Sequence, residues 1–305
     1  MNALSVLLFV AATLRITVPY ALAASGASLG ERGGVVCLGL EGFMLNSALA
    51  YVLGAWYLHN PWLALLCAVL AGMATAGLHA LVTVTFRADQ ITSGIGINLL
   101  AAGLTRFVLV TVFNSSSNSP RVPGLPELPL GPLSNLPALG SLLETPLVVL
   151  TIVLVPVAAW LVFRTPFGLR LRATGELPAA SAALGLSVGA LRASGVLLCG
   201  AFSGLAGAWL ASEQHCFTDN MTGGRGYIAI AAMIVGKWHP AGAAAACLLF
   251  GATEAAQIAL QGSNFPSALL QALPYAVTML ALAGFIGRAT PPRALGTPYD
   301  PEGTI

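Results

Sequence analysis

Charged residues are scarce in this chain. Only 8% of its 305 residues are Asp, Glu, Lys or Arg, whereas a soluble domain has about 25%. Hydrophobic residues make up 57%, and the mean hydropathy is +0.84. A soluble protein of this composition would lack the polar surface to cover itself. Apolar runs near 20 residues fit spanning helices rather than barrel strands, so we expect an all-α integral membrane protein. The net charge of +2 does not suggest a nucleic-acid partner.

The residues of common catalytic and metal sites are also missing. The single lysine, Lys237, is followed by Trp238, so the Gly-Lys-Ser/Thr of a phosphate-binding loop is absent. None of the four histidines has a second metal ligand at a typical spacing. The five cysteines are irregularly spaced and lie mostly in apolar runs, which is typical of buried reduced thiols. We therefore expect no catalytic residue, metal site or cofactor in this chain, and no ATP hydrolysis by it.

The apolar runs predict a polytopic bundle of about eight or nine spans. The first run resembles a signal peptide, but it lacks a positively charged start and Arg15 interrupts it. We interpret it as a span, with a cleaved signal as the alternative. Two pieces predict broken or re-entrant helices, and the one at 226–238 either crosses or re-enters. The predicted spans cover residues 4–26, 35–58, 61–86, 91–113, 145–163, 193–212, 226–238, 241–261 and 266–287.

These spans predict one transmembrane domain over residues 1–287 and a polar tail over 288–305. Residues 114–144 form a Pro-, Ser- and Asn-rich loop that we place outside. Residues 164–192 form a basic loop that we place in the cytoplasm, because positive charge near span ends resists translocation. If 226–238 crosses, most basic residues lie inside, and the C-terminus is cytoplasmic. The four arginines of the basic loop are Arg164, Arg170, Arg172 and Arg192.

Two segments of the chain have the same form. Each has an apolar run, an aromatic–His–(Asn)–Pro turn at His59 or His239, and an Ala/Gly-rich span. The predicted layout places these two turns on opposite sides of the membrane, as the inverted repeats of transporters do. The alternative is a chance likeness between alanine-rich helices.

Polar side chains inside the predicted spans are the candidates for a translocation path. Burial in lipid is costly for them unless they face a pathway or a partner. They either line a path for a small hydrophilic solute or form hydrogen bonds between helices. The candidates are Glu41, Asn46, Ser93, Asn98, Glu254 and Gln257.

The basic loop contains GELPAASAALGL, which has the features of a short docking helix. Glu176 near its start favours the positive end of a helix dipole, and Pro178 suits a first helical turn. Gly185 permits a sharp exit. The segment either inserts into a cleft of another protein or is a solvated helix without a partner.

Five motifs follow one another across about residues 25–287. They are GERGGVVCLGLEGFML, QITSGIGINLLAAGL, RATGELPAASAALGL, SGLAGAWLAS and GRGYIAIAAMIVGKWHPAGA. Together they resemble the permease subunits of bacterial ABC importers. The branch is the one that serves ribose-type sugars, branched-chain amino acids and nucleosides, and the nearest match is the shorter permease of nucleoside systems of the basic-membrane-lipoprotein type. Cys37 stands where that family often has Asn.

This resemblance implies a multi-pass subunit of the bacterial cytoplasmic membrane that moves a small polar solute, either a nucleoside, which is favoured, or a simple sugar. It implies an ATP-binding partner subunit that holds ATP and Mg, a second homologous permease, and an extracytoplasmic solute-binding protein or lipoprotein. Membrane lipid surrounds the bundle. The residues implied to couple to the ATPase are Glu176, Leu177, Pro178, Ala183, Leu184 and Gly185.

Two other functions remain open from the sequence. One is a branched-chain amino acid permease of the same branch, although the paucity of buried charge favours an uncharged solute. The other is an ion-coupled secondary transporter that uses Glu41 or Glu254 as its ion site. The sequence also leaves open whether the pore is a homodimer or a heterodimer.

Overall fold

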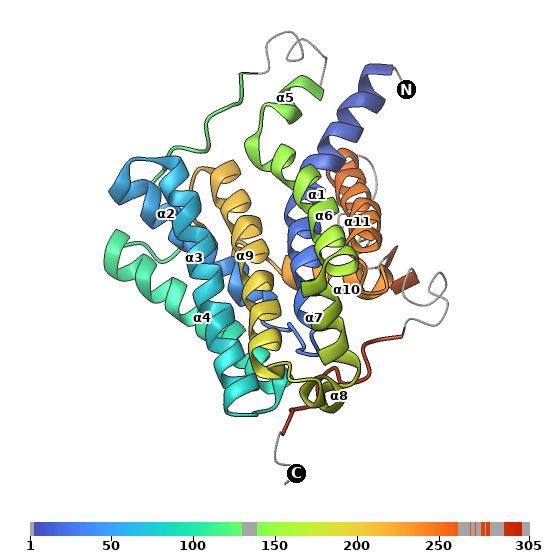
Figure 1. Cartoon of the computed structure of the whole chain (residues 1–305). Coiled ribbons are helices and arrows are strands. Elements are labelled where there is room, and N and C mark those ends of the chain that lie inside the picture. Colours follow the sequence, from blue (N-terminus) through green and yellow to red (C-terminus); the bar gives the residue numbers. More distant parts are fainter. Residues whose placement is uncertain are drawn as a thin grey trace.

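The computed structural model describes residues 3–129, 139–261 and 290–300, with single residues between 269 and 280. Regular structure in these ranges is helical, apart from one bridge between Asn118 and Thr218 (Figure 1). The elements are α1 (Ala3–Arg32), α2 (Leu40–Leu58), α3 (Pro61–Ala80), the π-helical η1 (Leu81–Thr85), α4 (Gln90–Phe113), α5 (Leu139–Leu143), α6 (Pro146–Arg164), α7 (Pro166–Glu176), α8 (Pro178–Ala183), α9 (Val188–Gln214), α10 (Arg225–Val235) and α11 (Pro240–Leu260).

Six helices of the described residues are long and apolar enough to cross a membrane. The chain is therefore an all-helical, polytopic membrane protein, as predicted. The expected total of eight or nine spans is not confirmed: α2 is not among the six, α10 has only 11 residues, and the predicted span at 266–287 lies largely outside the described residues. The six are Val6–Arg32, Pro61–Thr85, Gln90–Phe113, Pro146–Arg164, Val188–Gln214 and Pro240–Leu260.

Two predicted boundaries were wrong. The first span was expected to end near residue 26, but α1 continues to Arg32 because its last turns pack against α9, where Gly30 lies against Cys199. The sixth span was expected to start at residue 193, but α9 starts at Val188, and Arg192 is therefore helical rather than part of the loop. Tertiary packing overrides the local signals at both boundaries.

Proline and a polar cap define the starts of several helices. Asn60 precedes Pro61, and its side chain accepts a hydrogen bond from the N–H of Trp62 (2.9 Å) at the start of α3. His239 precedes Pro240 and accepts from the N–H of Ala241 (3.2 Å) at the start of α11. Proline fits the first helical position because the N–H that it lacks would have no helical partner there.

Helix α9 lies at the centre of the bundle, between α1 and α3, and α1 also packs against α11. Small residues allow these helices to approach closely. A methyl group added at Gly72 of α3 would collide with the carbonyl oxygen of Gly200 of α9. Such contacts are typical of membrane bundles, where lipid supplies no hydrophobic drive between helices and close van der Waals packing replaces it.

Helices α1 and α9 run in opposite directions along the bundle (Figure 1). The turn at His59 between α2 and α3 lies at the end of the bundle that holds the N-terminus. The turn at His239 between α10 and α11 lies at the opposite end, beside α7, where His239 stacks on Phe163 (ring centroids 4.5 Å apart). The two segments of similar form thus face opposite ends, as the sequence predicts.

Residues 290–300 of the polar tail lie at the α7–α8 end of the bundle (Figure 1). The N–H of Ala294 donates to the carbonyl oxygen of Gly175 at the end of α7 (2.8 Å), and the side chains of Pro292 and Ala294 are buried. The tail is therefore packed on the same face as the basic loop.

Candidate functional site

The basic loop folds as two helices in sequence, α7 and α8. Thr165 caps α7 by accepting from the N–H of Gly168 (3.1 Å), and Pro166 occupies its first position. The chain turns at Leu177, and Pro178 begins α8. Gly185 has a φ of +79°, a left-handed conformation that glycine adopts without strain, and it ends the segment. The predicted short helix with a glycine exit is present.

The tip of this loop is apolar and exposed. Leu184 is 81% exposed and Leu177 is 58% exposed, whereas Ser181 between them is buried. Ala183 and Gly185 are also exposed, and the carboxylate of Glu176 accepts from the N–H of Arg293 (3.4 Å). Exposed large apolar side chains at the tip of a loop are typical of a surface that another protein covers.

The four arginines of the basic loop have different surroundings. Arg164 and Arg170 are exposed. Arg172 lies over the ring of Phe163, 5.1 Å from its centroid, and donates to the carbonyl oxygen of Val162 (3.1 Å). Arg192 is buried inside the start of α9. Only part of the positive charge predicted for this loop therefore remains accessible to solvent.

Glu41 at the start of α2 holds the start of α10. Its two carboxylate oxygens accept from the N–H groups of Gly224 and Gly226, each at 2.7 Å. The free N–H groups of a helix start form a partial positive charge, which a carboxylate stabilises. Glu41 is buried, and through these contacts it joins the starts of two helices.

Asn98 of α4 connects α2, α4 and α10. Its side chain accepts from the N–H of Gly42 (2.8 Å) and donates to the carbonyl oxygen of Leu38 and to the hydroxyl of Tyr227, each at 3.0 Å. Tyr227 is exposed on α10. Asn98 is thus a predicted path residue that bonds to an exposed side chain of another helix, Tyr227.

Glu254 of α11 belongs to a second polar cluster. It accepts from the hydroxyl of Tyr20 of α1 (2.5 Å) and pairs with the guanidinium of Arg225 at the start of α10 (3.2 Å). The layout drawn from the sequence placed Arg225 in an outer loop. The structure instead places it among packed helices, where it neutralises Glu254.

The remaining predicted path residues are separated. Ser93 bonds to the ring of His79 (2.9 Å), whose other nitrogen lies 2.9 Å from the carbonyl oxygen of Val36. Asn46 donates to Thr75 (3.2 Å), and Gln257 lies one turn beyond Glu254 on α11. The six residues therefore do not form one site within this chain, and their role in a path stays a prediction.

A third cluster joins α1 to the end of α10, and the sequence analysis did not identify it. The indole N–H of Trp238 donates to buried Glu31 (2.7 Å), and Arg32 donates to the carbonyl oxygens of Trp238 (2.9 Å) and Lys237 (3.1 Å). The only sequence signal for this cluster is the adjacent charged pair Glu31 and Arg32 between two apolar runs. The sequence predicts a loop for these two residues.

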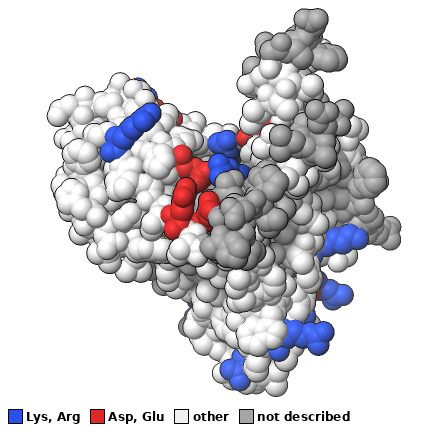
Figure 2. All heavy atoms as spheres, turned by 90° about the horizontal axis from the view of Figure 1, so that it is seen from above, with Lys and Arg blue, Asp and Glu red and all other residues white. Residues whose placement is uncertain are grey.

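The face opposite α7 and α8 bears a group of charged residues. Acidic and basic side chains gather beside each other near the middle of this face (Figure 2). Arg15 of α1 pairs with Glu213 near the end of α9 (3.6 Å). This face therefore carries charge of both signs near its middle.

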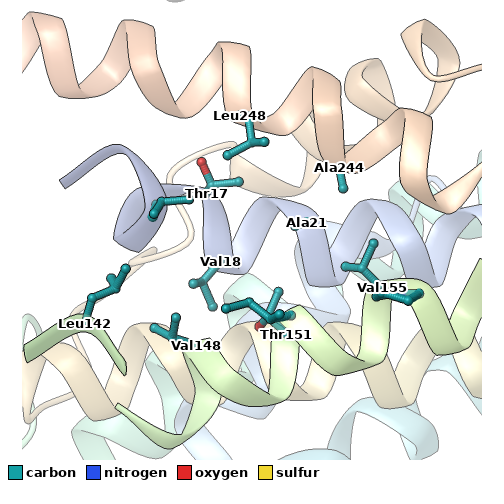
Figure 3. A pocket seen from close by; sticks show the side chains of 12 residues that line it. Thr17, Val18, Ala21, Leu142, Val148, Thr151, Val155, Ala244 and Leu248 are labelled. Atoms are coloured by element: carbon teal, nitrogen blue, oxygen red, sulfur yellow. The ribbon is translucent and has the colours of Figure 1, made fainter. Parts of the chain in front are cut away.

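A cavity of about 260 Å³ lies between α1, α5, α6 and α11 (Figure 3). Its wall is apolar apart from Thr17 and Thr151, whose hydroxyls donate to carbonyl oxygens of their own helices (2.7 and 2.6 Å). These hydroxyls are already paired, so the cavity offers little to a polar solute. The cavity is lined mainly by apolar side chains, and none of Glu41, Asn98 and Glu254 is part of its wall.

The geometry therefore combines a polytopic bundle, polar clusters that join its helices and an exposed apolar loop tip at one end. Residues 9–282 match the family described as "Branched-chain amino acid transport system / permease component". The chain belongs to this permease family. It is accordingly a multi-pass protein of the inner membrane and a transport component rather than an enzyme.

Two relatives match almost over their whole length. The guanosine ABC transporter permease protein NupQ of Bacillus subtilis is 37% identical over 96% of this chain and 96% of its own. The nucleoside ABC transporter permease protein NupC of Lactococcus lactis is 38% identical over 98% of this chain and 99% of its own.

A solved structure, an inward-facing conformation of a metal-chelate type ABC transporter, shares the fold. Its TM-score is 0.50 at 17% identity, over 90% of this chain and 85% of that one.

Proposed function

We propose that this chain is a transmembrane subunit of an ATP-driven importer that moves nucleosides across the bacterial cytoplasmic membrane. The observation that carries this proposal is the 37–38% identity, over nearly the whole length, to a guanosine permease and a nucleoside permease. No bond of the solute is made or broken. The chain offers a path whose opening alternates between the two sides.

The ATP-binding partner subunit is expected to contact the tip of the basic loop. The exposed Leu177 and Leu184 on either side of α8 support this assignment, because a cleft in a partner would remove their apolar surface from water. Glu176, Pro178, Ala183 and Gly185 shape the segment that presents them. We assign this end of the molecule to the cytoplasm, and with it the C-terminal segment that packs there.

A second permease subunit is expected on the outward face of α4. The large apolar side chains Ile95, Leu99 and Phe107 are exposed there, while Asn98 points to α2 and α10. Glu41, Asn98 and Glu254 are hydrogen-bonded within the chain, so a path between two permeases fits them better than a path through one. A solute-binding protein would dock on the opposite, charged face (Figure 2).

We further propose that α1–α3 and α9–α11 are inverted repeats. Helix α1 packs on α11 as α9 packs on α3, and the matching turns at His59 and His239 face opposite ends. Inverted repeats of this kind place binding sites near the middle of the membrane.

The test is uptake of labelled guanosine by vesicles that contain the purified complex with its ATP-binding subunit. ATP-dependent uptake is expected for the wild type. Leu184→Ser should lose most co-purified ATPase and most uptake, because it removes the apolar tip. Leu58→Ser is the matched control, since Leu58 is an exposed leucine at the opposite end of the bundle. Wild-type vesicles without ATP-dependent uptake would refute the proposal.

The family description makes a branched-chain amino acid permease the second candidate. An amino acid carries two charges and needs counter-charges or helix ends along its path. In the described residues, Arg225 and Glu254 neutralise each other, and Glu41 holds the start of α10. Competition of guanosine uptake by leucine or isoleucine separates the two: competition at equal concentration would favour the amino acid.

A further inference from the structure

The C-terminal segment contacts four separate parts of the face that holds α7 and α8. Ala294 bonds to Gly175 at the end of α7, and Arg293 bonds through its N–H to Glu176. Gly34 of the α1–α2 connection lies close to the carbonyl oxygen of Ala294. We call residues 291–300 the strap, because they run across this face rather than away from it (Figure 1).

Arg192 fixes the middle of the strap. It is only 3% exposed, and one nitrogen of its guanidinium donates to the carbonyl oxygen of Thr297 (2.9 Å). A buried guanidinium requires partners, because desolvation of an unpaired charge is costly. The strap supplies one such partner from a position 105 residues later in the chain, whereas Nε and the second terminal nitrogen of Arg192 have none within the described residues.

The far end of the strap pairs with the turn before α4. Arg87 follows η1 and adopts a left-handed φ of +57°. Its guanidinium lies 2.8 Å from a carboxylate oxygen of Asp300, whose side chain is only 7% exposed. A charge-assisted contact with one nearly buried partner is stronger than an ordinary surface ion pair.

The strap spans a gap between this turn and the basic loop, which is the coupling loop under the proposed function. A cavity of about 350 Å³ is lined by Ala182 and Leu186 of the loop, by Thr85 and Arg87 of the turn, and by Tyr299 of the strap. Helices α8 and α4 are therefore connected indirectly at this place, through the strap. The contiguous contacts run from Gly175 through Thr297 to Asp300 and Arg87.

We propose that the strap transmits displacement of the coupling loop to the start of α4, with the Arg87–Asp300 pair as its positioning contact. The inference rests on the proposed function, in which an ATP-binding subunit moves α8. Helix α4 carries Asn98, so a shift of its start reaches the contacts with Gly42 and Tyr227. The strap positions α4 and does not itself touch the solute.

The test compares solute moved per ATP hydrolysed, with the complete complex in vesicles and guanosine as solute. Asp300→Asn and Arg87→Gln should each lower this ratio by about three-fold or more, within the range of mutations along a coupling route. The doubly substituted Arg87→Asp/Asp300→Arg should recover most of the loss, because it restores the pair with reversed charges. Arg293→Gln is the control, since only the backbone of this exposed residue contacts α7.

A purely structural strap predicts a different pattern. Asp300→Asn would then lower the yield or the melting temperature of the complex and leave the solute-to-ATP ratio unchanged, which would overturn the proposal. If Asp300→Asn does not assemble, Arg87→Lys replaces it; this variant keeps the charge without the planar fork, and an intermediate ratio is expected. A wild-type ratio in Arg87→Lys and no rescue by the charge reversal would overturn the proposal equally. Failure of the proposed function itself is recognised separately, as absent ATP-dependent uptake in the wild type.

Discussion

Glu41 accepts a hydrogen bond from the N–H of Gly226 at 2.7 Å, across 185 residues of sequence. The contact joins the first residues of α2 to the first residues of α10. A carboxylate that also binds the N–H of Gly224 satisfies two donors which otherwise have no partner in the interior of the bundle.

Glu41→Ala is expected to destabilise the protein in detergent by about 1.5–3 kcal/mol, the usual value for hydrogen bonds to a charged group. Glu41→Gln should cost less, because its amide oxygen still accepts one of the two N–H groups. Thermal unfolding of the purified variants measures both effects. Equal melting temperatures for Glu41→Ala and the wild type would show that α10 does not depend on this carboxylate.

Gly72→Ala is expected to destabilise the bundle by about 1–3 kcal/mol, the range for overpacked sites. The added methyl group would collide with the carbonyl oxygen of Gly200, a backbone atom that can move only with α9. Gly77→Ala on the same helix is the control, because its methyl group would meet only the side chain of Leu197 at 3.4 Å. A similar loss in both variants would contradict close packing of α3 on α9.

Glu254→Gln is expected to reduce guanosine uptake without abolishing it. The glutamine can still accept from Tyr20, but Arg225 loses its counter-charge. Uptake should remain ATP-dependent and insensitive to an ionophore that collapses ion gradients. Complete loss of uptake in Glu254→Gln, together with ionophore sensitivity of the wild type, would instead support an ion-coupled carrier.

His239 is expected to make stability depend on pH. Burial lowers the pKa of its imidazole, and the nearby positive charge of Arg32 lowers it further. The unfolded state therefore binds more protons below the ordinary histidine pKa of about 6.5, and stability falls as the pH drops through that value. The neutral ring accepts from the N–H of Ala241, and protonation removes this cap.

The measurement is the change in melting temperature between pH 7.5 and pH 5.5. His239→Asn keeps a capping group that does not titrate, so its change should be smaller than that of the wild type. His59→Asn, at the matching turn on the opposite end, controls for the loss of one histidine. An unchanged pH dependence in His239→Asn would remove His239 from this role.

The sequence predicted those parts of the fold that depend on local signals. The sequence predicted a short helix between Pro178 and Gly185, because proline restricts the backbone and glycine frees it. Helix α8 starts at Pro178 and ends before Gly185. The apolar runs likewise gave the long helices. The number of spans was less certain, because α2 contains Glu41 and Asn46 and α10 is short.

The partners of buried polar residues could not be predicted in this way. The sequence identified Glu41, Asn98 and Glu254 as unusual, but it did not indicate that they bind Gly226, Tyr227 and Arg225, which are far away along the chain. Arg192 was expected in a basic loop because an arginine near a span end is usually solvated. It is instead buried and donates to a carbonyl oxygen of the strap, which lies 105 residues later in the chain.

The two attachments of α10 have a mechanical consequence. Its start is held by Glu41 and its end by Glu31 and Arg32, so a helix from the second half of the sequence is fastened at both ends to the first half. The two halves of the chain are therefore joined at both ends of α10, and this joint resists a motion that would separate them. Under the proposed function, the opening that admits a solute is then expected at the border with the second permease rather than between these two halves.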